Sequence, residues 1–334
     1  MPEPLLQVNN LKMYFPVRSG IFLRQAGWVK AVDDVSFNIY PGETLGLVGE
    51  SGCGKSTIGK SIVRLLKPTG GSILFNGQNI ATLSQRKMRP LRPHIQMVFQ
   101  DPAESLNQRQ SIGQIVAEPF VIHRMGTPAE RREWVRGLLD RVGLPDSAID
   151  RFPFEFSGGQ RQRIGIARTL ALQPKLLIAD EAVSALDVSV QAQIINLLEE
   201  LQKSLHLTML FISHDLSVVR CMTDRAVVMY LGKIMEMGPT EHLFGAPAHP
   251  YTRNLIDAVP EPDPDCPPKE STMIGEPPSP MDIPGGCRFH PRCPYAKNVC
   301  RRAQPELTDL GGGHFAACHF PYACAGAPQT EAEQ

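Results

Sequence analysis

The chain has 334 residues, of which 42% are hydrophobic, 20% charged and 7% aromatic. This composition excludes wholesale disorder, and the length exceeds the ~250–300 residues at which a single core stops growing, which favours one large domain with an appendage. Because 34 basic residues balance 34 acidic ones, the chain has no net charge with which to grip nucleic acid non-specifically.

Neither membrane insertion nor secretion is indicated. The longest uncharged apolar runs, such as residues 207–212, have the length of a strand, whereas a bilayer span needs roughly 18–20 residues. The first four residues, Met1 to Pro4, lack the basic start and apolar core of a secretory signal. We therefore expect the chain to stay in the cytosol, where disulfides are rare, so its cysteines need another explanation.

Before residue 260, strand-like and helix-like segments alternate. Strands are predicted at 44–49, 95–99, 176–179 and 207–212, helices at 56–66 and 190–205, and a hairpin over 227–237. This alternation predicts an α/β fold with a parallel sheet that is covered on both faces by helices. The charged stretch 124–155 has helical character and predicts an inserted helical lobe.

The sequence Gly49-Glu-Ser-Gly-Cys-Gly-Lys55-Ser56, here called the phosphate loop, fits G-x-x-x-x-G-K-[ST] at every fixed position. It follows a predicted strand and precedes a predicted helix, which is the context this motif requires. Glycines let backbone N–H groups point inward at an anion, and the helix N-terminus adds partial positive charge. We expect Lys55 to reach the β- and γ-phosphates and Ser56 to ligate Mg²⁺, while Cys53 is a small filler at a variable position.

Four further polar residues follow three of the predicted strands. Asp180 and Glu181 end the strand at 176–179, where Asp180 can hold the Mg²⁺ hydration shell and Glu181 can act as general base on the attacking water. His214 ends another strand, and we expect it to face the γ-phosphate. Gln100 follows the strand at 95–99 and can contact Mg²⁺ or the water.

The run Phe156-Ser157-Gly158-Gly159-Gln160 resembles the signature motif of ATP-binding-cassette (ABC) ATPases, and lies in that family's order between the phosphate loop and Glu181. The resemblance implies a P-loop NTPase with a RecA-like core, an antiparallel β subdomain, a helical lobe and a small C-terminal cysteine-containing extension. It also implies that the Ser157 helix meets ATP held by a partner subunit. Ser184 to Asp187 looks like the D-loop, Gln100 matches the Q-loop and His214 the switch histidine. The implied nucleotide-binding residues are Phe15, which would stack on adenine with Tyr14 as the neighbour that could replace it, together with Gly49, Glu50, Ser51, Gly52, Cys53, Gly54, Lys55, Ser56, Thr57, Ser157, Gly158, Gly159, Gln160 and Asp187.

One residue departs from the family pattern. Proline usually follows the catalytic glutamate, and this chain has Ala182. Loss of proline at a suitable φ costs about 0.4–1 kcal/mol, mostly through the unfolded chain. We expect folding and hydrolysis to survive, with looser control of the turn at Glu181.

The branch of the family is indicated by residues 248–253 (AHPYTR) and by the proline-rich stretch that follows. This combination resembles the bacterial oligopeptide and dipeptide importer ATPases. Residues 16–20, with a short insertion up to Lys30, resemble the same region of the second, F-type, of their two non-identical ATPase subunits. The resemblance implies ATP and Mg²⁺ as cofactors, a second non-identical ATPase, two membrane permeases, a periplasmic or lipid-anchored binding protein and no nucleic acid. It places the chain on the cytoplasmic face of the bacterial inner membrane. Nickel, glycosides or antimicrobial peptides are alternative substrates, and a soluble redox-sensing regulatory ATPase is the alternative from another class.

The cysteines are concentrated late in the chain, with six of the eight beyond residue 260. Cys287, Cys293, Cys300 and Cys318 form a spacing that fits neither zinc ribbons nor ferredoxins, so residue chemistry alone leaves iron–sulfur, zinc and unligated thiols open. The dipeptide-branch resemblance implies a 4Fe-4S cluster on these four cysteines. Cys266 and Cys324 are possible substitutes, and His290, His314 and His319 are nearby nitrogen donors.

The expected domain organisation has three parts. An ABC ATP-binding domain spans 5–258, with its helical lobe at about 101–170. Ten prolines between Pro260 and Pro291 exclude a long helix or a central strand there, which predicts a linker over 259–286. An iron–sulfur module would then occupy 287–325.

Overall fold

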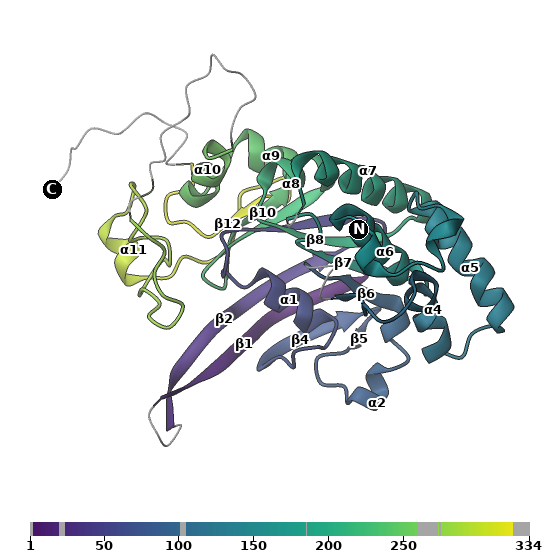
Figure 1. Ribbon diagram of the computed structural model, residues 1–334. Helices are drawn as coiled ribbons and strands as arrows, with labels where there is room; N and C mark the ends of the chain where they lie inside the picture. Colours follow the sequence, from purple (N-terminus) through teal and green to yellow (C-terminus); the bar gives the residue numbers. More distant parts are fainter. Residues whose placement is uncertain are drawn as a thin grey trace, which may run out of the picture. The chain divides into compact units, whose positions relative to one another are not determined.

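The computed structural model describes residues 3–19, 24–100, 105–184, 186–259, 273 and 275–322. The chain divides into two compact units. Figure 1 labels their helices and strands. The first unit takes in residues 3–5, 39–44 and 82–213, and the second takes in residues 6–38, 45–81 and 214–322.

The first unit is built on three parallel strands. β6 (Ile95–Val98) pairs with β7 (Leu176–Asp180), which pairs with β8 (Thr208–Ser213). Every residue of β7 and β8 is buried, as expected for parallel strands covered on both faces. The carboxyl ends of β6 and β7 bring Asp180 and the residues that follow these two strands to one edge.

The helices of the first unit have well-formed N-termini. α4 (Ile112–Ile122), α5 (Pro128–Arg141) and α6 (Gly158–Leu170) each begin with a capping box, in which the Ser or Thr N-cap and the third helical residue satisfy each other's backbone N–H groups. The longest helix, α7 (Val188–Leu205), is capped by Asp187. The described residues of this unit also form α2 (Gln85–Met88) and the 3₁₀ turns Arg92–His94, Asp146–Ala148 and Pro153–Glu155.

The second unit contains an antiparallel sheet in the order β2-β1-β4-β5 and a further run of strands in the order β11-β12-β10-β9-β3. In that run β3 and β9 are parallel, whereas β9 and β10 form an antiparallel hairpin. The strands are β1 (Leu6–Ser19), β2 (Arg24–Ile39), β3 (Thr44–Val48), β4 (Gly70–Phe75), β5 (Gln78–Asn79), β9 (Arg225–Tyr230), β10 (Lys233–Pro239), β11 (Thr308–Asp309) and β12 (Phe315–Ala316). The helices are α1 (Lys55–Ile62), α8 (Leu216–Met222), α9 (Thr240–Gly245), α10 (Pro250–Asp257) and α11 (Asn298–Arg302).

The stretch from Cys287 to Cys318, here called the cysteine segment, belongs to the second unit and packs against its strands and helices. β12 extends the hairpin by pairing with β10, through Glu236 with Ala316 and Met237 with Phe315. Phe289 is fully buried, and its ring centroid lies 5.5 Å from that of Tyr230 and 5.3 Å from that of Tyr251. In Figure 1 this yellow part of the chain lies beside α10 and β10.

A fully buried carboxylate ties the same region together. Glu236 of β10 accepts the backbone N–H groups of Ala248 at 2.7 Å and His249 at 2.9 Å, and lies 2.7 Å from Nε2 of His314. Because an isolated buried charge is unfavourable, these three partners are what allow Glu236 to remain in the interior.

The predicted elements are confirmed, with shifted ends. The strands at 44–49, 95–99, 176–179 and 207–212 and the hairpin over 227–237 are all present. The helix expected over 56–66 is shorter, because Arg64 adopts the left-handed conformation with φ 59° and ends it. Within the described residues of 273–286 there is neither helix nor strand, as the proline content predicts.

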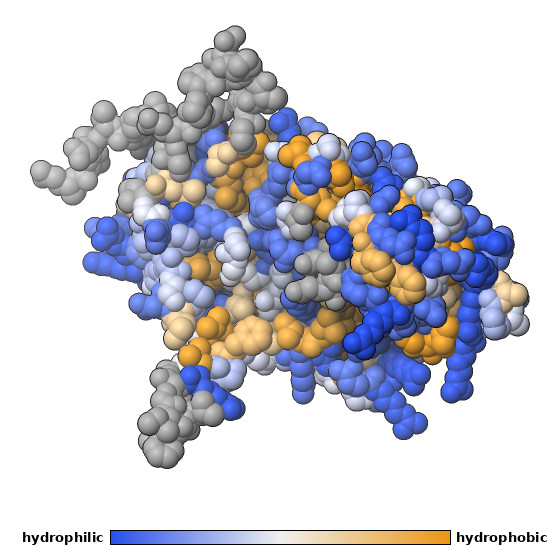
Figure 2. All heavy atoms as spheres, viewed as in Figure 1, coloured by the Kyte–Doolittle hydropathy of each residue, from blue (hydrophilic) through white to orange (hydrophobic). Residues whose placement is uncertain are grey.

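No helix among the described residues is long and apolar enough to span a bilayer. Figure 2 shows a face that is largely hydrophilic with separate hydrophobic patches. The exposed large apolar residues of the helical lobe include Val121, Ile122, Met125, Trp134 and Phe154.

The buried His249 predicts a measurable pH dependence. Its Nδ1 accepts the Tyr251 N–H at 3.0 Å, and burial lowers the pKa of His249 to about 4. Because this folded-state pKa lies below the unfolded one, the stabilisation is complete above about pH 6.5 and is lost as the pH falls toward 4. Between pH 6.5 and 5.5 we expect the wild type to lose about 1 kcal/mol more unfolding free energy than His249→Asn, which keeps a helix-capping acceptor but does not titrate. Urea unfolding at both pH values measures this, and equal losses would contradict it.

Candidate nucleotide site

The phosphate loop has a backbone that only glycine fits at two of its positions. Gly49 and Gly54 have φ of 148° and 109°, and a Cβ at either one would lie 2.1 Å from a backbone oxygen, that of Met229 and that of Ala31 respectively. The loop is therefore enclosed by β9 on one side and β2 on the other. Its last glycine directly precedes α1, so the N-terminus of that helix opens into the loop.

Lys55 lies inside this loop. Its side chain is buried, and its ammonium donates to the carbonyl of Gly49 at 2.6 Å and to that of Glu50 at 3.0 Å. The adjacent Cys53 is buried as well, and burial raises the pKa of its thiol, so it remains a neutral filler. Ser56 and Thr57 are half-buried at the start of α1, while Ser51 and Gly52 are exposed.

Glu50, the second residue of the phosphate loop, is held from the C-terminal part of the chain. Its backbone N–H donates to the hydroxyl of Tyr251 at 2.9 Å. Nη1 of Arg292 donates to both carboxylate oxygens of Glu50, at 2.9 Å each. The side chains of Arg292 and Glu50 are 8% and 24% exposed, so this ion pair is largely shielded from solvent.

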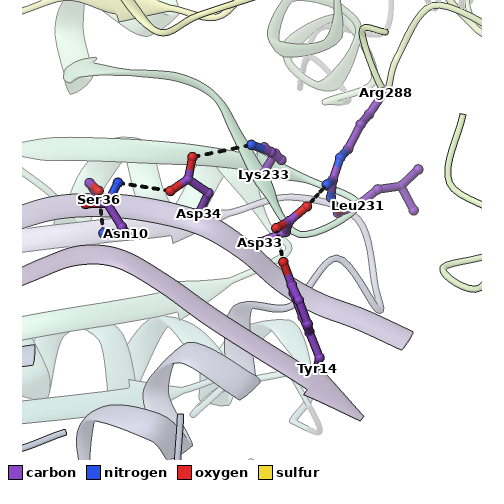
Figure 3. Close-up of polar contacts among 8 residues, drawn as sticks. All are labelled: Asn10, Tyr14, Asp33, Asp34, Ser36, Leu231, Lys233 and Arg288. Carbon is purple, nitrogen blue, oxygen red and sulfur yellow. Dashed lines mark hydrogen bonds and ion pairs between the residues drawn. The ribbon is translucent and has the colours of Figure 1, made fainter. Parts of the chain in front are cut away.

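A second polar cluster surrounds Tyr14 (Figure 3). The Tyr14 hydroxyl donates to Asp33, and Arg288 donates both to Asp33 and to the carbonyl of Leu231. Burial, followed by the hydrogen bond to Asp33, raises the pKa of Tyr14 to about 12. Burial disfavours the charge on Asp33, but the Tyr14 hydrogen bond and the Arg288 charge outweigh it and lower the pKa of that carboxyl.

The two aromatic candidates for stacking on adenine therefore differ in their surroundings. Tyr14 is fixed through its hydroxyl, and its ring lies 5.7 Å from the ammonium of Lys30. Phe15, the predicted adenine contact, is half-buried at the next position of β1. Because successive residues of a strand point to opposite faces, the two rings project from opposite sides of β1.

In the first unit, β7 ends with Asp180 buried and Glu181 half-buried. Nε2 of Gln100, which follows β6, donates to Oε2 of Glu181 at 2.8 Å. Two residues that lie 81 positions apart in the chain, and that were both singled out by sequence, are thus brought together.

Glu181 has an unusual backbone. Its φ of 47° lies in the left-handed region, which costs a non-glycine residue about 1–3 kcal/mol. Its N–H donates to Ile212 of β8 at 3.0 Å, and its carbonyl accepts from Ser184 through the backbone N–H at 3.2 Å and the hydroxyl at 3.1 Å. These bonds hold the turn, in which the buried Ala182 takes the place of the usual proline.

The Phe156–Gln160 motif forms the start of α6. Ser157 accepts the Gln160 N–H at 3.3 Å and Gln160 accepts the Ser157 N–H at 3.0 Å. A Cβ on Gly159 would lie 2.2 Å from Val190, so this glycine is needed for the close packing of α6 on α7. Asp187, exposed at the start of α7, accepts the Val190 N–H at 3.0 Å, whereas Ala185 of the expected D-loop lies outside the described residues.

Comparison with known proteins identifies the family. A model described as ABC transporter matches residues 32–184, and one described as Oligopeptide/dipeptide transporter, C-terminal region, matches residues 235–300. The oligopeptide transport ATP-binding protein AppF of Bacillus subtilis is 56% identical over 321 residues, which are 95% of this chain and 98% of AppF. The chain belongs to the ABC transporter ATPases. A putative peptide import ATP-binding protein of Brucella ovis is 51% identical, covering 94% of this chain and 97% of the relative.

Solved structures support the same ABC ATPase fold. The ATP-binding cassette MJ0796, a dimer in a post-hydrolysis state with ADP and Pi, matches with a TM-score of 0.63 at 27% identity, covering 70% of this chain and 98% of that one. CbiO1 of Clostridium perfringens, part of the ABC transporter complex cbiONQ, matches with a TM-score of 0.62 at 32% identity, covering 73% of this chain and 91% of that one. The expected fold class is therefore confirmed.

The four cysteines of the ABC ATPase tail line one small cavity of about 20 Å³, together with His290 and several aromatic rings. Cys287 and Cys300 are buried, and the Cys287 N–H donates to the Cys300 carbonyl at 2.8 Å. Burial above all, with the nearby thiols of the other three cysteines, raises the pKa of Cys318 to about 12. Each cysteine in the described part of the chain is a free thiol, and no group of three His, Cys, Asp or Glu there is arranged so that it could hold a metal ion. Cys266 and Cys324 lie outside the described residues.

The remaining sequence candidates, and the residues that sequence reasoning missed, are also placed. His214 is exposed directly after β8. Three contributors to the phosphate loop and the Tyr14 cluster were not predicted: Tyr251, Arg288 and Arg292. Tyr251 belongs to the 248–253 motif that was used only to assign the branch, and the two arginines directly follow Cys287 and directly precede Cys293.

Proposed function

We propose that this chain is the ATP-hydrolysing, energy-coupling subunit of an ABC importer for dipeptides and oligopeptides. The observation that carries the proposal is similarity over nearly the whole chain to peptide-transport ATP-binding proteins, including their C-terminal region. The phosphate loop supplies the expected chemistry, because a buried ammonium and a helix N-terminus together provide a site for the β- and γ-phosphates of ATP.

The roles of the individual residues follow from their chemistry. Lys55 binds the phosphates, and Ser56, Gln100 and Asp180 supply the oxygen ligands that Mg²⁺ prefers. Mg²⁺, when bound, neutralises charge on the transferred phosphoryl group. Glu181 accepts the proton of the attacking water. The hydrogen bond from Gln100 supports this assignment, since it orients the Glu181 carboxylate in a charge-assisted contact.

His214 is proposed to contact the γ-phosphate, and Phe15 to stack on adenine. Ser157, Gly158, Gly159 and Gln160 at the start of α6 are proposed to complete the site of a partner subunit, with Asp187 beside them. The N-terminus of α6 supports this, because the partial positive charge at the start of a helix favours an anion.

The partners are proposed from the relatives. The similar cassette MJ0796 forms a dimer, which supports pairing of this chain with a second ATPase, and we propose a non-identical one as in the two-subunit importers that the sequence resembles. Two membrane permeases and a periplasmic or lipid-anchored binding protein would complete the transporter. The chain would then lie on the cytoplasmic face of the inner membrane.

We also propose a 4Fe-4S cluster on Cys287, Cys293, Cys300 and Cys318. Their convergence on one cavity and the softness of thiolate ligands support it. A bound cluster would stabilise the thiolate forms of Cys287 and Cys318, whose pKa values are raised by burial.

Glu181→Gln is expected to bind ATP with unchanged affinity but to lose at least about 100-fold in turnover, because glutamine retains the shape and hydrogen bonding of the side chain without its basicity. Steady-state phosphate release and ATP binding measure the two effects. Glu200→Gln, an exposed carboxylate on α7, is the matched control. Wild-type turnover by the Glu181 variant would remove this residue from the role of base.

Cells that lack this subunit are expected to lose uptake of radiolabelled short peptides and to regain it with the wild-type chain but not with Lys55→Ala. A panel that includes nickel, a glycoside and an antimicrobial peptide separates the substrate classes. If peptide uptake were unimpaired and uptake of another solute were lost, that solute would be the substrate in place of peptides. If uptake of no solute were impaired, a soluble regulatory ATPase would be favoured.

The chain purified without oxygen is expected to carry about four iron atoms and acid-labile sulfide per molecule. Replacement of all four cysteines with serine is expected to abolish both, whereas the exposed Cys221→Ser is expected to leave them unchanged. Metal and sulfide analysis provides the measurement. Zinc in place of iron, or no metal in the wild type, would refute the cluster.

A further inference from the structure

The cysteine segment contacts the phosphate loop through the side chain of Arg292. Arg292 reaches Glu50 with a single guanidinium nitrogen that lies 2.9 Å from each carboxylate oxygen. Glu50 is separated by 242 positions from its partner, and it occupies a position at which the loop motif permits any residue. Motif chemistry alone therefore does not explain why this particular side chain is paired and shielded.

Arg292 contacts the aromatic side chain of Tyr230. Its guanidinium carbon lies 5.8 Å from the Tyr230 ring centroid, and Nη1 also lies 3.4 Å from the Tyr230 hydroxyl. The Tyr230 ring contacts that of Tyr251 at 4.8 Å, and Tyr251 in turn accepts the backbone N–H of Glu50. Glu50 is thus fixed at both its backbone and its side chain by one packed group of residues.

The same segment has a second anchor, at Arg288. Arg288, four residues before Arg292, is buried and bridges Asp33 of β2 and the carbonyl of Leu231 after β9, as Figure 3 shows. Phe289, the next residue, is fully buried and its ring contacts the Tyr230 and Tyr251 rings. With Arg288 and Phe289 both buried, Arg292 has little freedom to move away from the loop.

We propose that Arg292 is a positioning residue of the nucleotide site, which acts through Glu50 to hold the phosphate loop and to cancel a negative charge beside the triphosphate. The inference rests on the proposed ATP-binding function. An unpaired Glu50 carboxylate would repel the phosphates and would release one anchor of the loop. The C-terminal tail then belongs to the nucleotide site and does more than pack against the fold.

The test measures Mg-ATP affinity of the full chain by calorimetry, together with its melting temperature and steady-state ATP hydrolysis. Arg292→Gln is expected to weaken ATP binding by roughly tenfold to a hundredfold, the range of one charge-assisted hydrogen-bonded pair. The KM for ATP rises accordingly, whereas kcat changes less than twofold. Arg292→Lys, which keeps a charged donor nitrogen, recovers most of the affinity. Arg302→Gln, an exposed arginine on α11, leaves the affinity unchanged.

The double variant Arg292→Gln with Glu50→Gln distinguishes positioning from simple loss of fold. If Arg292 acts through Glu50, removal of both charges restores much of the affinity lost in the single variant. A lowered melting temperature with unchanged ATP affinity in Arg292→Gln would overturn the proposal and leave a purely structural role. A wild-type chain that binds no ATP would instead overturn the proposed function itself.

Discussion

The confinement of a lysine ammonium within a glycine-dependent loop is the constraint on which the second unit depends. Gly49 lies against the carbonyl of Met229 on β9, and Gly54 lies against that of Ala31 on β2, so the loop can exist only where these strands leave space for a bare backbone. Gly232, in the turn after β9, adds a hydrogen bond from its N–H to Cys53 at 2.9 Å. The positions of β2, β9 and the phosphate loop therefore depend on one another.

The C-terminal tail is joined to this arrangement by polar contacts that lie deep in the interior. Glu236 receives two backbone N–H groups and contacts His314, while Arg288 bridges Asp33 and Leu231. Such groups are costly to bury singly and tolerable only as satisfied sets, so the tail and the strands that it contacts are expected to fold together. The positions of two cysteines depend on these contacts as well, because Cys287 directly precedes Arg288 and Cys293 directly follows Arg292.

Much of the fold and most of the candidate site could be read from local patterns. Strands such as β7 and β8 are continuous apolar runs because they are buried on both faces. The phosphate loop and the N-cap of α6 are each formed by residues close together in the sequence, so they can be recognised as motifs. Helix ends were less predictable: α1 stops where Arg64 turns left-handed, a conformation that its sequence does not demand. The left-handed Glu181 was also unpredictable, because bonds from β8 and Ser184 impose it.

The sequence by itself determined the class of chemistry, since Lys55, Asp180, Glu181 and Ser157 lie in motifs whose function depends on neighbours a few residues away. Only the tertiary structure decided that Gln100 contacts Glu181, that Tyr251 and Arg292 hold Glu50, and that four scattered cysteines share one cavity. The physical reason is the separation along the chain over which each kind of interaction acts. Backbone conformation and helix capping are set by adjacent residues, whereas a salt bridge across 242 positions exists only after packing has excluded water around it.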